Sequence, residues 1–205
     1  MKTMMLVSMF QNVSALLPQL EPDIEGKTVA YIPTASAVEK LGFFVKLGKR
    51  RLKKLGLIVN ELDVATAPYG VICEALESCD CIYVAGGNTF FLLQELRRTG
   101  ADTLLAGAVS AGKLYIGESA GAIVVAPDIG YSAEMDDAGK APELTSYAGL
   151  DLVDFSVVPH LRNWELGKAA ERIVERYSSE LDLRAITDDQ AIFVRGDATE
   201  IAELR

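Results

Sequence analysis

The sequence has little histidine, cysteine or positive charge. Its 205 residues include one His and three Cys, and 29 acidic residues outnumber 20 Lys and Arg, for a net charge of -9. Non-specific nucleic-acid binding depends on cations that neutralise phosphates, so this balance argues against such a partner. An odd number of cysteines argues against a disulfide framework, and one histidine leaves no zinc ligand set. We therefore expect no nucleic acid, no metal and no cofactor.

Long apolar runs are also missing. The run Ala122 to Ala126 is far shorter than the roughly 18 residues that a membrane span requires. Residues Met1 to Phe10 contain one Lys and lack the small-residue cleavage site of a signal peptide. We therefore expect no membrane association and a cytoplasmic protein. Half of the residues are hydrophobic, and the length suits a single domain over residues 1–205.

Short β-rich runs and longer helix-like stretches alternate along the first 120 residues. Such alternation predicts an α/β fold, a three-layer sandwich in which helices cover both faces of a mostly parallel sheet. The expected strands are 4–10, 28–33, 57–64, 81–85 and 114–117, and the expected helices are 13–20, 38–55, 69–78, 89–98 and 101–111.

The pattern changes after Ala126. Residues 129–149 are rich in Asp, Gly, Ala and Ser and have little periodicity, which is typical of a loop or a short irregular hairpin. A strand at 155–158 and an amphipathic helix at 164–179 follow. Residues 185–186 and 191–195 suggest a closing pair of strands around the turn Asp188-Asp189.

Two of the predicted strands end in glycine-rich segments. One carries Gly86-Gly87, and the other carries Gly117-x-Ser119-x-Gly121 before a predicted helix. The second pattern fits a nucleophile elbow, a sharp turn that exposes a serine hydroxyl above the carboxyl edge of the sheet. Ligands of doubly wound sheets bind at this edge, so Ser119 is a candidate nucleophile.

A serine nucleophile needs a base, and His160 is the only histidine. His160 directly follows the apolar run Val157-Val158-Pro159, at another expected strand end. A carboxylate must then orient the imidazole, and sequence spacing alone leaves its identity open. The candidates are Glu134, Asp136 and Asp137 in the irregular segment, followed by Asp128 and Glu118.

The Gly86-Gly87 segment can also supply an N–H group to an oxyanion hole, together with the N–H of Ala120 after the nucleophile. A phosphate-binding turn is the alternative interpretation of these glycines. It is disfavoured because neither G-x-G-x-x-G nor G-x-x-x-x-G-K occurs in the chain.

Three segments together resemble the peptidase E-like serine peptidases, which include aspartyl dipeptidases and, more distantly, cyanophycinases. The resemblance covers nearly the whole chain. Its motifs are Gly86-Gly87-Asn88-Thr89-Phe90, the run Leu114 to Ala122 around Ser119, and Pro159-His160-Leu161-x-Asn163. It implies a fold similar to class I glutamine amidotransferases and a serine peptidase that hydrolyses short peptides, as a dipeptidase does, through an acyl-enzyme.

The resemblance also implies roles for individual residues. Ser119 would be the nucleophile and His160 the base, and the family acid, about fifteen residues after the serine, falls on Glu134. Gly87 and Ala120 would form the oxyanion hole. Asn88 and Asn163 are expected to contact the peptide, and a monomer or homodimer is expected.

Two departures from the family concern specificity. Glu118 stands where the aspartyl dipeptidases carry Trp, and no Arg clearly occupies the position that recognises an acidic substrate side chain in those enzymes. We therefore expect a weak or absent preference for Asp-Xaa dipeptides. Two other functions remain open, a catalytically silent binding protein of this fold and an α/β-hydrolase-type esterase. The esterase is disfavoured because His160 follows Ser119 too closely in the sequence.

Overall fold

A seven-stranded sheet forms the centre of the protein in a computed structural model that describes residues 1–39 and 42–204. The strand order is β3-β2-β4-β5-β1-β8-β9, and only β8 and β9 run antiparallel to their neighbours. The strands are β1 (Thr3–Val7), β2 (Thr28–Ile32), β3 (Ile58–Glu61), β4 (Cys81–Val84), β5 (Leu114–Glu118), β8 (Gln190–Arg195) and β9 (Ala198–Glu203).

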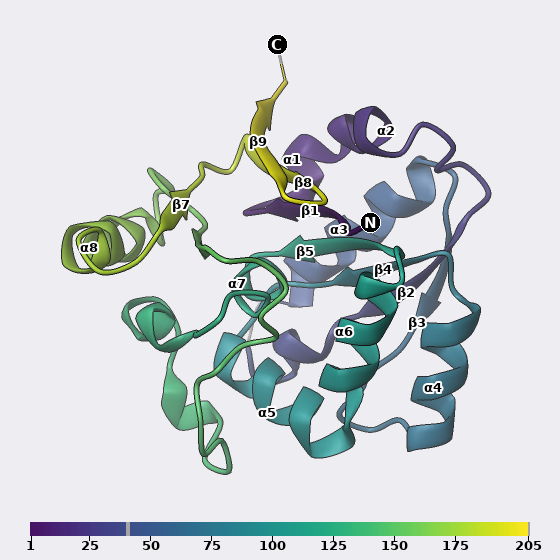
Figure 1. The fold of residues 1–205 in the computed structure, drawn as a ribbon, viewed down its shortest axis with the longest axis horizontal. Helices are drawn as coiled ribbons and strands as arrows, with labels where there is room; N and C mark the ends of the chain where they lie inside the picture. Colours follow the sequence, from purple (N-terminus) through teal and green to yellow (C-terminus); the bar gives the residue numbers. More distant parts are fainter. Residues whose placement is uncertain (40–41, 205) are drawn as a thin grey trace.

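Helices cover both faces of this sheet (Figure 1). One layer contains α1 (Phe10–Val13), α2 (Leu17–Leu20) and α3 (Gly42–Lys54), and the other contains α4 (Tyr69–Ser78), α5 (Thr89–Thr99) and α6 (Ala101–Ser110). The predicted α/β class with a mostly parallel sheet is therefore confirmed. The predicted helix 13–20 is instead three short pieces, with a 3₁₀ turn over Ser14–Leu16 between α1 and α2.

The apolar strands separate two cores because alternate side chains point to opposite faces. In β1, Met4 and Leu6 pack with the layer of α4 to α6, whereas Met5 and Val7 pack with the layer of α1 to α3. All four side chains are fully buried. A strand covered on both faces reads as a continuous apolar run, which is why the sequence pattern located these strands.

The chain after β5 is less regular. The elements are α7 (Ala120–Ile123), 3₁₀ turns over Gly130–Glu134 and Ala138–Lys140, β6 (Ser156–Val158), α8 (Gly167–Tyr177) and β7 (Leu183–Ala185). The expected closing pair of strands is wrong. β7 pairs in parallel with β6, and β8 pairs with β1 and β9. β9 was not predicted from the sequence because this edge strand is largely exposed and carries no apolar alternation.

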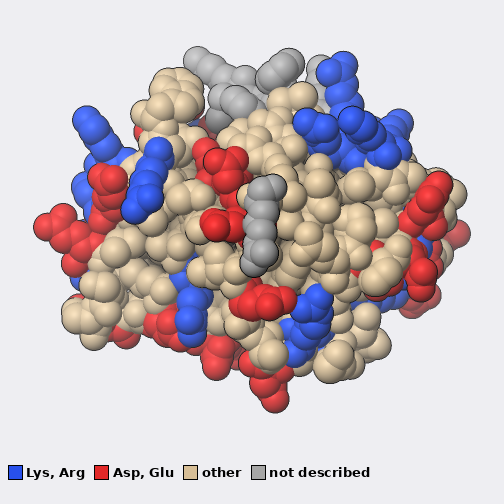
Figure 2. Space-filling model, turned by 90° about the horizontal axis from the view of Figure 1, so that it is seen from above, with Lys and Arg blue, Asp and Glu red and all other residues tan. Residues whose placement is uncertain are grey.

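The carboxyl ends of β1, β4 and β5 lie at one edge of the sheet because these strands run parallel. Within the described ranges, no helix is long and apolar enough to cross a membrane, and no cluster of His, Cys, Asp and Glu could hold a metal ion. Figure 2 shows a compact patch of Lys and Arg on one face, with acidic and basic side chains mixed over the rest of it.

Candidate active site

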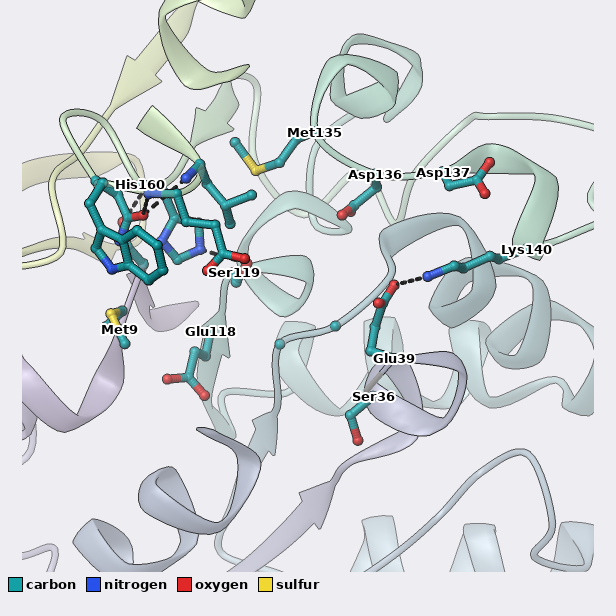
Figure 3. A pocket seen from close by; sticks show the side chains of 17 residues that line it. Met9, Ser36, Glu39, Glu118, Ser119, Met135, Asp136, Asp137, Lys140 and His160 are labelled. Carbon is teal, nitrogen blue, oxygen red and sulfur yellow. Dashed lines mark hydrogen bonds and ion pairs between the residues drawn. The ribbon is translucent and has the colours of Figure 1, made fainter. Parts of the chain in front are cut away.

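A pocket of about 380 Å³ opens at this carboxyl edge (Figure 3). Three parts of its lining begin where a strand ends: Ser8 and Met9 after β1, Gly86 and Gly87 after β4, and Ser119 after β5. His160 enters from the end of β6. The volume falls within the usual range for sites that bind small molecules. The structure thus brings into one cavity the three strand ends that the sequence indicated, at Gly86-Gly87, Ser119 and His160.

Ser119 occupies a strained turn between β5 and α7. Its φ of 50° and ψ of -107° are unusual for a residue with a side chain and cost on the order of 1–3 kcal/mol. The Ser119 N–H donates to the Val7 carbonyl at 2.8 Å, which ties the turn to β1. Gly121 allows α7 to approach β4, because a Cβ at this position would collide with the Val84 carbonyl. A strained strand-to-helix turn of this kind is what a nucleophile elbow requires, and the elbow itself stays a prediction.

His160 lies between Ser119 and Asp188. Its Nε2 is 2.9 Å from Ser119 Oγ, and its Nδ1 is 2.8 Å from Asp188 Oδ1. The side chain is almost entirely buried, and the backbone has a positive φ of 65°. The N–H of His160 donates to the buried Ser8 hydroxyl at 2.9 Å, and that hydroxyl donates to the Thr187 carbonyl at 3.1 Å. Ser8 therefore connects the histidine to the loop that carries Asp188.

The expectation that Glu134 orients His160 is corrected by these contacts. Glu134 accepts hydrogen bonds from Arg176 at 2.8 Å and Arg172 at 3.2 Å, and these two partners lower the pKa of its carboxyl. Both arginines project from α8, one helical turn apart, toward the 3₁₀ turn that ends at Glu134. The residue that meets His160 is Asp188.

Two further acids proposed from the sequence, Asp136 and Asp137, form their hydrogen bonds with other partners than the imidazole. Asp136 accepts bonds from the N–H and hydroxyl groups of Thr89 at the start of α5. Asp137 accepts the N–H of Gly139 at 2.9 Å. Both carboxylates therefore hold turns or helix ends, which is a common role for Asp.

Asp188 is held in place from both sides. Asn163 Nδ2 donates to its Oδ2 at 2.5 Å, while His160 binds its Oδ1. Burial alone would raise the pKa of Asp188, but the bonds from His160 and Asn163 and the charge of His160 together lower it. The carboxyl is therefore ionised at neutral pH, as an orienting group for an imidazole must be.

The structure places the two asparagines differently: Asn163 lines the pocket, and its contact with the peptide stays a prediction, whereas Asn88 is not among the lining residues. Asn163 Oδ1 accepts the N–H groups of Glu165 at 2.8 Å and Leu166 at 3.0 Å, so its whole amide is used to order this loop and to bind Asp188. Asn88 is fully buried. Its side chain accepts the Phe91 N–H as the N-cap of α5 and donates to the Asp137 carbonyl, so it does not face the pocket.

Two backbone N–H groups near Ser119 are suited to an oxyanion hole. Gly87 has a φ of 144°, and a Cβ there would collide with the Ala35 carbonyl, so only glycine fits. Ala120 is the first residue of α7 and directly follows the nucleophile. In residues 1–39 and 42–204, neither N–H donates to a turn, loop or cap acceptor. Both groups remain available for a ligand oxygen.

Glu118 directly precedes the nucleophile and lines the pocket. Its carboxylate accepts the Phe10 N–H at 2.8 Å and the Tyr83 hydroxyl at 2.7 Å. Burial raises the pKa of Glu118, and these two bonds oppose that rise. No ion pair to Glu118 occurs within the part of the chain that the structure describes.

Comparison with known proteins decides the family. The model of peptidase family S51 matches residues 4–202, which is nearly the whole chain. The chain belongs to peptidase family S51. It is therefore a serine-type peptidase, which sets aside the silent binding protein and the α/β-hydrolase-type esterase.

Several S51 relatives match over most of their length. An uncharacterised peptidase of Listeria monocytogenes is 50% identical over 196 residues, 96% of each chain, and one of Pasteurella multocida is 44% identical over 197 residues, 96% of this chain and 95% of the other. Peptidase E of Salmonella typhimurium is 31% identical over 148 residues, 72% of this chain and 61% of its own. A 1.5 Å crystal structure of a candidate peptidase E protein from Listeria monocytogenes superimposes with a TM-score of 0.95, at 48% identity and full coverage of both chains.

Proposed function

We propose that this S51 peptidase hydrolyses short peptides, as a dipeptidase does, through an acyl-enzyme formed on Ser119. The observation that carries the proposal is the hydrogen-bonded chain from Ser119 Oγ through His160 to Asp188, with distances of 2.9 and 2.8 Å. A nucleophile, a base and an orienting acid in hydrogen-bond contact are the arrangement that activates a serine hydroxyl.

Acylation begins when Ser119 Oγ attacks the carbonyl carbon of the peptide. A C–O bond forms, and the hydroxyl proton passes to Nε2 of His160. The resulting imidazolium is stabilised by the ionised Asp188 on Nδ1. His160 then gives this proton to the departing nitrogen, and the C–N bond breaks. The amine product departs, and the acyl group remains bound to Ser119 as an ester.

Deacylation repeats these steps with water. His160 removes a proton from the water, whose oxygen attacks the ester carbonyl, and then returns the proton to Ser119 Oγ as the C–O bond to the serine breaks. Both tetrahedral intermediates carry an oxyanion, and we propose that the N–H groups of Gly87 and Ala120 donate hydrogen bonds to it. A donor of this kind contributes a factor of about 10² to 10³ in kcat in other serine peptidases.

The small pocket and the relatives named peptidase E support this proposed substrate class. The most direct test is a dipeptide library incubated with the wild-type protein and with Ser119→Ala as the blank. We expect amine release that depends on Ser119. Because triad members act as a unit, His160→Ala should lower kcat as much as Ser119→Ala does, by several orders of magnitude. Wild-type-like turnover by either variant would refute this mechanism.

A further inference from the structure

The only tryptophan of the chain, Trp164, is an unusual feature of the pocket rim. It lines the pocket, yet it is 89% exposed, the largest exposed fraction among the large hydrophobic side chains of the described residues. An indole normally contributes most when it is covered, because it offers a large apolar surface. An exposed Trp beside a nucleophile therefore needs an explanation in terms of what covers it.

The loop that carries Trp164 is well ordered. The Asn163 side chain accepts two N–H groups of the following turn, and the Asn163 carbonyl accepts the Gly167 N–H at 3.0 Å. Leu161 donates to the Ile186 carbonyl at 3.0 Å, which fixes the start of the loop. Since these bonds hold the backbone on both sides of Trp164, the indole is presented at the rim without the entropic cost of ordering a mobile loop.

The position of the loop relative to the chemistry identifies which part of a peptide it faces. His160 Nε2 must reach both Ser119 Oγ and the departing nitrogen, so the residue that leaves as the amine lies on the histidine side of Ser119. Figure 3 shows Met9 and His160 on this side of the nucleophile, and Asp136 and Glu39 on the opposite side.

The two ends of the pocket differ in chemistry. The loop after His160 contributes Trp164, Glu165 and Leu166 to the lining, and the end of β1 contributes Met9, so three of these four side chains are large and apolar. The lining also carries the carboxylates of Glu39 and Asp136 together with Met135 and Lys140, and Lys140 pairs with Glu39 at 2.6 Å. An apolar group is therefore favoured at the end from which the amine product departs.

We propose that Trp164, with Met9 and Leu166, binds the side chain of the residue on the amine side of the scissile bond, and selects a large apolar or aromatic residue there. This inference rests on the proposed function, because it uses the direction in which His160 protonates the leaving group. Trp164 is a specificity-determining residue in this account, since its indole covers a substrate side chain and takes no part in proton transfer.

The test compares Ala-Phe with Ala-Gly as substrates. Wild-type kcat/KM should be at least tenfold higher for Ala-Phe, with most of the difference in KM. Trp164→Ala should remove this preference, chiefly by lowering kcat/KM for Ala-Phe, whereas Trp164→Phe should keep part of it. Tyr69→Ala is the matched control, because Tyr69 is also exposed but lies on α4 and does not line the pocket.

Fluorescence supplies a second readout because Trp164 is the only tryptophan. In Ser119→Ala, Ala-Phe should shift the emission to shorter wavelength, and Ala-Gly should shift it much less. An equal response to both dipeptides overturns the inference, as does a preference for Ala-Phe that survives in Trp164→Ala. The emission could already be at shorter wavelength without peptide and move to longer wavelength on dilution. This result would show that a second copy of the chain covers the indole, and it would also overturn the inference.

The two proposals fail differently. If the wild-type protein hydrolyses neither dipeptide and no other member of the library, the proposed function is refuted, and the emission titration alone decides whether the apolar end binds a large side chain. If it hydrolyses both at the same kcat/KM, the proposed function stands and the role of Trp164 is wrong.

Discussion

Replacing Asp188 with asparagine tests the assignment of the orienting acid. The hydrogen bonds of the loop determine what the new amide can do. Asn163 Oδ1 accepts two backbone N–H groups, so its Nδ2 must point at residue 188, where it needs an acceptor. The asparagine in Asp188→Asn would therefore turn its oxygen toward Asn163 and its NH₂ group toward His160.

This orientation imposes the wrong tautomer on the histidine. An NH₂ group that faces Nδ1 requires an unprotonated Nδ1, so the imidazole proton moves to Nε2, which can then no longer accept the proton of Ser119. The matching substitution in another serine peptidase lowers kcat by about 10⁴, which corresponds to about 5.4 kcal/mol of activation free energy. We expect a loss of this size in Asp188→Asn, with the fold retained.

The matched control is Glu134→Gln. Among the residues that the structure describes, the Glu134 side chain forms its hydrogen bonds with Arg172 and Arg176 on α8, so this change should alter kcat by less than about twofold, a small effect typical of an exposed ion pair. The assay is initial-rate hydrolysis of the best dipeptide from the library, with circular dichroism as a check on folding. A severe loss in Glu134→Gln together with an active Asp188→Asn would refute this assignment.

The remaining predictions concern the surroundings of the triad. Ser8→Ala removes the acceptor for the His160 N–H and the bond to Thr187, and should lower kcat roughly tenfold with little change in KM, as expected for a loss of positioning. Glu118→Gln removes a negative charge beside the nucleophile, and should raise kcat/KM for Asp-Leu relative to Ala-Leu by roughly tenfold, whereas an unchanged ratio would show that the carboxylate has no influence on specificity. Chelators and thiol reagents should leave turnover unchanged, since the proposed nucleophile is a serine, and zinc-dependent recovery after chelation would contradict this. Because its pKa is lowered, the ionised Asp188 adds stability that is complete above its ordinary value of 3.8 and is lost as the pH falls below it. Urea unfolding should therefore show a larger difference between wild type and Asp188→Asn at pH 7 than in strong acid.

Much of the fold could be predicted because its information is local. Strands β1, β2, β4 and β5 are buried on both faces and stand out as apolar runs between helical periods. Which strands pair is not local information. Residues 183–185 and 190–195 are close in the sequence, yet they join different sheets, since β7 pairs with β6 and β8 pairs with β1.

The difference between local and tertiary information also explains which residues of the site could be predicted from the sequence. Ser119 and His160 could be located because a strained turn requires glycines and because the chain has a single histidine. The acid could not be located by counting residues from the serine, because Asp188 reaches His160 only through tertiary packing of the loop between β7 and β8. One sequence signal was nevertheless present. Asp188 comes two residues after the short apolar pair Ala185-Ile186, near the end of β7.

The central claim is that Ser119 is the nucleophile and that His160 and Asp188 activate it. Intact-protein mass spectrometry after reaction with a fluorophosphonate tests it most directly, because the reagent requires an activated serine. The account predicts a single adduct that maps to Ser119 in the wild-type protein, a much slower reaction in Asp188→Asn, an unchanged rate in Glu134→Gln and no adduct in Ser119→Ala. An adduct on another residue, or labelling of Asp188→Asn at the wild-type rate, would contradict it.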